Sequence, residues 1–94
     1  MKREERFTPN LLRKYRLLMG YEQTEVAFLL GLKSHARISE WEQGISKPSL
    51  DNLLQLSIIY RTLSEELYYD LRQEFVRELT EREKILMAVK DQGG

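Results

Sequence analysis

The polar residues with the most regular spacing lie in the segment SHARISEWEQG, residues 34–44. Ile38 and Trp41 are three residues apart, so on a helix both of them face inward. The side chains that then face outward are Ala36, Glu40 and Gln43, with Arg37 and Ser39 beside them and His35 at the exposed N-terminal end. Groups that donate and accept hydrogen bonds from one helix face are suited to reading base edges in a DNA major groove.

Enzymatic chemistry has few residues available to it. His35 is the single histidine, the chain contains no cysteine, and no glycine-rich phosphate loop is present. Disulfides, thiolate zinc sites and cysteine nucleophiles are therefore excluded. The carboxylates near the C-terminus interleave with Arg72, Arg77 and Arg82 at helical spacing, which is typical of a solvated, ion-paired face and not of a metal site. We expect neither an enzyme nor a cofactor.

Two short helices joined by a glycine turn must position the outward-facing residues. Residues 23–30 carry apolar residues at helical spacing and stop at Gly31, which tolerates the backbone of a helix C-terminus. Ser34 can cap the second helix, which ends at Gly44. The apolar residues of the first helix are Val26, Ala27, Leu29 and Leu30. The pattern predicts a DNA-binding helix-turn-helix.

A helix is also predicted before this segment, over residues 8–19. Thr8 is the expected N-cap, Pro9 the first helical residue, and Phe7 is placed to pack against Leu12. The expected buried stripe consists of Leu11, Leu12, Tyr15, Leu18 and Met19. Residues 1–6 are a charged run, which we interpret as a frayed terminus or as a basic arm that touches a phosphate or the minor groove.

Helical signals continue after Gly44. Ser49 can cap a fourth helix, whose expected core residues are Leu50, Leu53, Leu54 and Leu56 to Ile59. Ser64 can cap a fifth helix, with an apolar stripe formed by Leu67, Leu71, Phe75 and Leu79. The sequence TERE at residues 80–83 has the form of a capping box, so we expect a sixth helix, or a bent continuation of the fifth, that carries Ile85, Leu86 and Val89.

Three stretches, QTEVAFLLG, ISEWEQG and KPSLDNLLQLS, resemble the Cro or XRE type of phage-repressor helix-turn-helix domain. The resemblance covers residues 8–70 and implies a five-helix domain that binds operator DNA as a dimer. It also implies that Gln23 contacts a phosphate and that Arg16 pairs with Glu42. Between Gly31 and Gly44 the chain holds one residue more than the family pattern, placed in residues 32–34, which makes the register of His35 and Ala36 less secure than that of Glu40.

We expect two sets of DNA contacts. The base contacts are His35, Ala36, Glu40 and Gln43, and the phosphate contacts are Gln23, Lys33, Arg37, Ser46 and Lys47. Glu40 is unusual, because an acid facing DNA lowers affinity unless it accepts a hydrogen bond from a cytosine amino group.

The expected fold is all-α: a five-helix repressor-like helix-turn-helix domain with an additional C-terminal helix. The expected domains are an arm at residues 1–7, the DNA-binding domain at 8–70, a helical extension at 71–91 and a tail at 92–94. The 94 residues, 41% hydrophobic, are enough for one small core. The N-terminus lacks an apolar run and no membrane span is present, so a cytoplasmic protein is expected.

Charge and apolar surface bear on the partners of the chain. The net charge is zero, but residues 1–48 hold nine basic and six acidic residues (+3), whereas residues 49–94 hold six and nine (−3). Leu79, Ile85, Leu86 and Val89 offer more apolar surface than one small domain covers, which predicts a dimer interface. Two alternatives stay open. Residues 80–91 could fold back and complete the core, and the chain could be a protein-interaction module, such as the antitoxin of a toxin–antitoxin pair or an adaptor to the transcription machinery.

Overall fold

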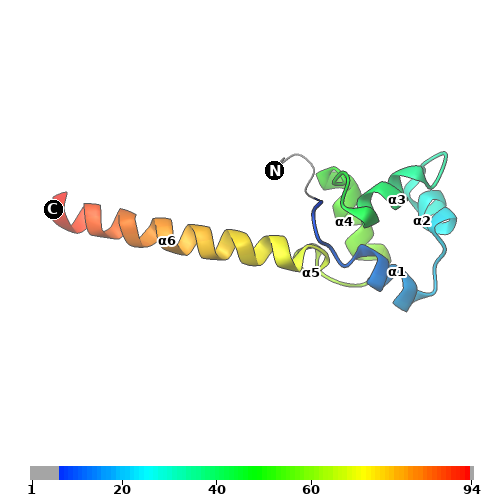
Figure 1. The fold of residues 1–94 in the computed structure, drawn as a ribbon. Helices are drawn as coiled ribbons and strands as arrows, with labels where there is room; N and C mark the ends of the chain where they lie inside the picture. The colour runs from blue at the N-terminus through cyan, green and yellow to red at the C-terminus, as the bar shows by residue number, and fades with distance from the viewer. Residues whose placement is uncertain (1–6, 94) are drawn as a thin grey trace.

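The computed structural model describes residues 7–93, which form an all-α fold. Within these residues the elements are α1 (Leu12–Met19), α2 (Gln23–Leu30), α3 (Ala36–Gln43), α4 (Leu50–Ile59), α5 (Ser64–Leu67) and α6 (Tyr69–Gly93). The first five helices gather into one globular domain, and α6 extends away from it as a single long rod (Figure 1). The all-helical class and the additional C-terminal helix are therefore confirmed. The arm expected at residues 1–7 lies outside the described residues except for Phe7.

Helix α1 begins three residues later than the sequence predicted, at Leu12 and not at Pro9. Thr8 and Pro9 are not helical, because the Thr8 backbone N–H donates to the Gly44 carbonyl at 3.1 Å and holds this segment against the end of α3. The predicted packing of Phe7 onto Leu12 is also wrong, since Phe7 is exposed. Leu18, which we expected in the core, is 67% exposed; the buried side of α1 instead presents Leu12 and Arg16.

Helices α2 and α3 meet at the predicted glycine turn. Gly31 has φ +75°, a backbone conformation that residues with a side chain rarely adopt. Glu25 completes the start of α2, since its Oε1 accepts a hydrogen bond from the Glu22 backbone N–H at 2.7 Å. Of the apolar residues expected in α2, Val26 and Ala27 are buried, whereas Leu29 is about half exposed.

Helix α4 is capped as expected but buries fewer residues than expected. The Ser49 hydroxyl accepts the Asn52 backbone N–H at 3.2 Å. Leu50, Leu54 and Ile58 recur every four residues and share one side of the helix, and this side faces solvent. Their assignment to the core is therefore wrong.

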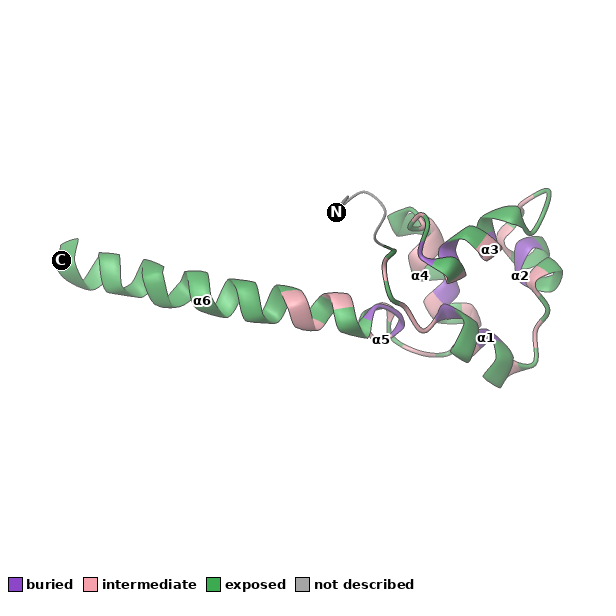
Figure 2. Cartoon of the chain, viewed as in Figure 1, coloured by how far each residue is buried: buried purple, intermediate pink, exposed green. Residues whose placement is uncertain are grey.

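The core lies where α1 to α5 converge, as the buried segments in Figure 2 show. Its fully buried members come from all five helices or their ends: Leu12, Val26, Ala27, Ile38, Trp41, Leu56, Tyr60, Leu67 and Tyr68. Partly buried side chains, including Tyr15, Leu53 and Leu71, pack around this cluster.

The C-terminal helix begins earlier than expected and has no new start or bend at residues 80–83, where the sequence predicted one. A break at Tyr68 (φ −122°, ψ 48°) separates α5 from α6, and α6 then runs without interruption through residues 80–83. Every residue from Phe75 to Gly93 is exposed, so the helix does not fold back onto the domain (Figure 2). The expected tail is helical as far as Gly93. In residues 7–93 no helix has the length and apolarity that crossing a bilayer requires.

Candidate DNA interface

Helix α3 is anchored by one face and open on the other. Ile38 is 1% and Trp41 4% exposed, as their spacing predicted. The polar residues of the outer face are exposed along its whole length, from His35 at the N-cap to Glu40 and Gln43 near the end. Anchoring of this kind fixes the direction in which the outer side chains point, which recognition of a rigid duplex requires.

The expected base-contact residues are His35, Ala36, Glu40 and Gln43, and all four are exposed. Gln43 is not free to rotate, because its Nε2 donates to the Ser39 hydroxyl at 2.8 Å on the same helix. This bond uses an N–H of the amide group and leaves the Gln43 amide oxygen available as an acceptor. Glu40, one turn of helix before Gly44, has an exposed carboxylate.

Two of the expected phosphate contacts lie close together, Lys33 in the turn between α2 and α3 and Arg37 in the first turn of α3. Lys33 and Arg37 are both exposed and line one shallow pocket with Gly31, Leu32 and Ser34. The Ser34 hydroxyl accepts the Ala36 backbone N–H at 3.3 Å, so it satisfies a donor at the start of α3 although His35 occupies the N-cap position. Two cations beside a helix N-terminus form a site suited to an anionic oxygen.

Gln23, another expected phosphate contact, is engaged inside the protein. Its Nε2 donates to Glu42 Oε1 at 3.0 Å, and its side chain is half-buried. An amide nitrogen carries two hydrogens, so one N–H is committed to Glu42 and a second one can serve a phosphate oxygen. The bond to Glu42 thereby sets the orientation of the Gln23 side chain at the start of α2.

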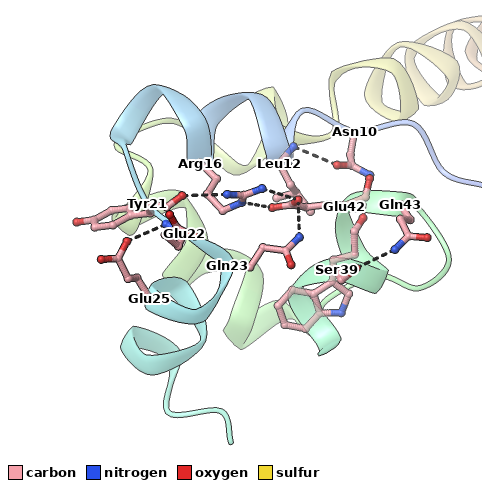
Figure 3. Close-up of polar contacts among 11 residues, drawn as sticks. Asn10, Leu12, Arg16, Tyr21, Glu22, Gln23, Glu25, Ser39, Glu42 and Gln43 are labelled. Atoms are coloured by element: carbon pink, nitrogen blue, oxygen red, sulfur yellow. Dashed lines mark hydrogen bonds and ion pairs between the residues drawn. The ribbon is translucent and has the colours of Figure 1, made fainter. Parts of the chain in front are cut away.

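Glu42 is the centre of a network that joins three helices (Figure 3). Arg16 Nε donates to Glu42 Oε2 at 2.5 Å and Arg16 Nη2 donates to Oε1 at 3.1 Å, which is a bidentate ion pair. Arg16 Nη1 also donates to the Tyr21 carbonyl at 2.9 Å. The hydrogen bond that Arg16 donates to the Glu42 carboxylate raises the pKa of Arg16 above its ordinary value. The pair and Gln23 thus fix α1, α2 and the end of α3 relative to one another.

Asn10 also holds the C-terminal end of α3, and our sequence interpretation missed it. Its Nδ2 donates to the Trp41 carbonyl at 2.9 Å and the Thr8 carbonyl at 3.1 Å, while its Oδ1 accepts the Leu12 backbone N–H at 3.0 Å. One side chain therefore starts α1 and satisfies a carbonyl at the C-terminal end of α3. An asparagine just before an apolar stripe is itself a helix-start signal, but Thr8 and Pro9 offered a stronger one two residues earlier.

Ser46 and Lys47, the remaining phosphate candidates, lie in the loop between α3 and α4. Lys47 is exposed and Ser46 half-buried. The loop leaves α3 through Gly44, whose φ of +81° turns the chain sharply. Both ends of α3 therefore have a hydroxyl and at least one cation nearby, which suits contacts with phosphates on either side of a groove.

Comparison with known families identifies the fold. A family described as Helix-turn-helix, the Cro/C1 type, matches residues 12–67, which is more than half of the chain. No curated protein matches the chain. The family consists of DNA-binding regulators and is not typically enzymatic. The chain belongs to the Cro/C1-type helix-turn-helix family and is a DNA-binding transcriptional regulator of that kind.

Proposed function

We propose that the protein binds a near-palindromic operator in double-stranded DNA as a dimer, with α3 of each copy in the major groove. The observation that carries the proposal is the division of α3 into two faces. Ile38 and Trp41 are buried on one face, and exposed polar side chains occupy the other. The Arg16–Glu42 pair and the Asn10 bonds hold the C-terminal end of this helix in place.

Base readout in this proposal comes from the outer face of α3. The contacting residues are His35, Ala36, Glu40 and Gln43. Glu40 accepts from the N4 amino group of a cytosine, since a carboxylate without such a donor would repel the phosphates on either side. A methyl group such as that of Ala36 is suited to contact with a thymine methyl group.

Phosphate contacts in this proposal surround the base-reading face. They are Gln23, Lys33, Arg37, Ser46 and Lys47. Three of these side chains carry a positive charge, and the two others are neutral donors. Such contacts set the position and orientation of α3 on the duplex without reading its sequence.

Dimerisation in this proposal uses the exposed helix α6. Leu79, Ile85, Leu86 and Val89 are all more than half exposed although they are large and apolar. A monomeric soluble domain rarely leaves so many apolar side chains open along one helix. A two-fold dimer presents two copies of α3, and it therefore demands a site with matching two-fold symmetry.

A second candidate function is that of a protein-interaction module, such as an antitoxin or an adaptor to the transcription machinery. One observation favours it: Phe28 on α2 is 81% exposed and lines an open groove with Tyr21 and Leu29. Large exposed aromatic side chains are common at protein interfaces. In that case the exposed face of α2, and not α3, would carry the main contact.

Selection of bound sequences from random duplex DNA tests the proposal. The full chain should enrich a near-palindromic motif with half-sites about one helical turn, roughly 34 Å, apart. Glu40→Ala should change the preference at a cytosine position, whereas Gln55→Ala, an exposed change on α4, should select the same motif as the parent. Failure to enrich any motif would favour the protein-interaction alternative.

A further inference from the structure

Helix α6 carries an apolar face with the repeat of a coiled coil. With Leu79 placed at heptad position a, the a and d positions are Arg72, Phe75, Leu79, Arg82, Leu86 and Val89. Leu71 and Ile85 at g and Val76 at e widen this face. The apolar side chains at these a and d positions, Phe75, Leu79, Leu86 and Val89, are between 50% and 59% exposed. The face thus runs along α6 and includes two charged residues, Arg72 at its start and Arg82 in its middle.

The same face continues into a groove at the base of α6. An open groove there, walled mainly by apolar atoms, is formed by Leu53, Glu65, Tyr68, Leu71, Arg72 and Phe75. At 100° per residue, Leu71 and Phe75 point to the same side of α6 as Leu79 and Leu86. Tyr68, at the break before α6, also lines the groove. A helix packed along the a and d positions would therefore also cover this groove.

We propose that α6 pairs with α6 of a second copy of this chain, in parallel and in register, as a two-stranded coiled coil. The phase of the pair follows from the face itself: Leu79 meets Leu79 and Leu86 meets Leu86 across the two-fold axis, and Phe75 of the second copy packs over the groove beside Leu53. This proposal rests on the proposed function, because a shared operator is what selects the parallel direction.

The length of α6 decides the direction. Its 25 residues span about 37 Å at 1.5 Å per residue, in a molecule whose longest dimension is 56 Å. An antiparallel pair would place the two domains at opposite ends of this rod, and α3 lies in the part of the domain beyond the start of α6 (Figure 1). The two copies of α3 would then be separated by more than the length of α6. A parallel pair sets both domains at one end, where a spacing of roughly 34 Å is accessible.

Arg82 fixes the register of the pair. In the in-register arrangement the two Arg82 side chains share one layer, with Glu83 of the second copy at the adjoining e position and Glu78 one turn earlier on the same helix. A shift by one heptad would place Arg82 against Phe75 or Val89, and its charge would lie in an apolar layer without that glutamate. At the base of the pair, Arg72 of the second copy approaches Glu65 on the groove wall, which adds a second charge match.

Disulfide trapping of the full chain tests the direction, since the sequence contains no native cysteine. Leu79→Cys and Leu86→Cys should each give a covalent dimer on mild oxidation, because identical positions face each other in a parallel pair. Arg77→Cys is the matched control, since position 77 lies at f on the opposite side of the helix and should stay uncrosslinked at the same concentration.

The outcomes separate this proposal from the proposed function. A dimer that crosslinks only when Leu79→Cys and Val89→Cys chains are mixed would be antiparallel, because position a then faces position d. It would overturn the parallel pairing, and DNA selection would return a single half-site in place of a near-palindrome. Sedimentation of the parent as a monomer at about 100 times the concentration that saturates DNA would overturn the pairing altogether. Efficient trapping at both positions, without enrichment of any DNA motif, would support the pairing and count against the proposed function.

A charge exchange tests Arg82 separately. Arg82→Glu places two glutamates per chain in one layer, and the dissociation constant of the dimer should rise about tenfold or more. Arg82→Glu combined with Glu83→Arg should restore most of the loss. If the single variant dimerises as tightly as the parent, Arg82 does not lie in the interface.

Discussion

Arg16 on α1 and Glu42 at the end of α3 form a bidentate ion pair whose side chains are 9% and 5% exposed. The pair joins residues 26 positions apart in sequence. Glu42 lies two positions after the exposed Glu40, so the two side chains point to opposite sides of α3. Gln23 adds a third donor to the Glu42 carboxylate. A buried carboxylate with three donors is well satisfied, and it depends on its cation remaining in place.

Removal of one member of the pair should therefore destabilise the domain strongly. Arg16→Ala leaves the buried Glu42 charge without its cation, and we expect a loss on the order of 3 kcal/mol in the free energy of unfolding. Arg13→Ala, an exposed change on the same helix, is the control and should shift stability by less than about 0.5 kcal/mol. Urea denaturation of Arg16→Ala, of Glu42→Ala and of the double variant gives the coupling energy of the pair. A coupling energy near zero would show that the pair does not act as a unit.

Gly44 is the glycine whose substitution should cost most. Gly20, Gly31 and Gly44 have φ of +80°, +75° and +81°, so alanine is strained to a similar degree at all three, by about 1–2 kcal/mol. A Cβ at Gly44 would in addition collide with the backbone of Thr8, whereas at Gly20 and Gly31 it meets open space. Gly44→Ala should thus lower the melting temperature more than Gly20→Ala or Gly31→Ala. Equal losses at the three positions would mean that the Thr8 segment moves aside without cost.

The Asn10 amide group should be as important as its oxygen. Asn10→Asp keeps the oxygen that accepts from Leu12 but removes the donors to the Trp41 and Thr8 carbonyls. We expect a loss of about 1–3 kcal/mol, because these carbonyls lose a hydrogen-bond donor in a partly buried place. Asn10→Asp also sets a carboxylate oxygen against these two carbonyl oxygens, so it should cost at least as much as Asn10→Ala, which only removes the side-chain bonds. Chemical denaturation of both variants makes the comparison, and an aspartate variant as stable as the parent would contradict the role given to Nδ2.

Tyr68 should limit stability at high pH. Its hydroxyl is buried without a hydrogen-bond partner among residues 7–93, and burial raises its pKa from 10.0 to about 12. Because the folded pKa lies above the unfolded one, the stability gained by keeping Tyr68 neutral is complete below pH 10 and is lost as the pH rises through 12. Tyr68→Phe should lose less stability over this window and should be at least as stable as the parent at pH 7, since an unpaired hydroxyl is removed.

Tyr15 provides the contrast for that measurement. Its hydroxyl donates to Glu66 Oε2 at 2.9 Å, and this bond raises its pKa. Tyr15→Phe removes a hydrogen bond that is made, so it should lower stability at pH 7, where Tyr68→Phe does not. Thermal melts of both variants at pH 7 and across pH 9–12 separate the two roles. A Tyr68→Phe variant less stable than the parent at pH 7 would mean that the hydroxyl finds a partner in solution.

The helix-turn-helix could be predicted from sequence because its signals are local and agree with one another. Ile38, Trp41 and Gly44 have a spacing that a helix with one buried face and a sharp end explains, and the structure places them so. The predicted start of α1 is wrong for the opposite reason. Thr8 carries a strong local helix signal, but its backbone hydrogen bond to Gly44 is a tertiary contact that no local pattern encodes.

Two other differences between the predicted and the observed structure have the same cause, because local patterns do not encode tertiary contacts. Apolar residues crowd α4, so the sequence alone did not reveal that Leu50, Leu54 and Ile58 occupy the one side that meets no neighbour. In α6 the capping-box pattern at residues 80–83 lies between good helix formers, and continuing the helix keeps backbone hydrogen bonds that a new start would interrupt. For the site, the spacing of Ile38 and Trp41 identified the exposed polar face of α3. Only the packing of α2 against α3 shows that Gln23 donates to Glu42.

Lys47 should contribute to DNA affinity through a phosphate and not through a base. The interface offers few donors, so the affinity of each subunit for a selected duplex should fall with salt at a slope that reflects roughly two to five phosphate contacts. Lys47→Ala should weaken binding to all sequences alike and reduce the slope by about one. Lys84→Ala, which removes an equally exposed charge on α6, is the control and should leave the slope unchanged. Fluorescence anisotropy between about 50 and 200 mM salt measures the affinity and its salt slope for the parent and for each variant. Affinity that does not respond to salt over this range would contradict the DNA interface itself, whereas equal slopes for the parent and Lys47→Ala would remove only Lys47 from it.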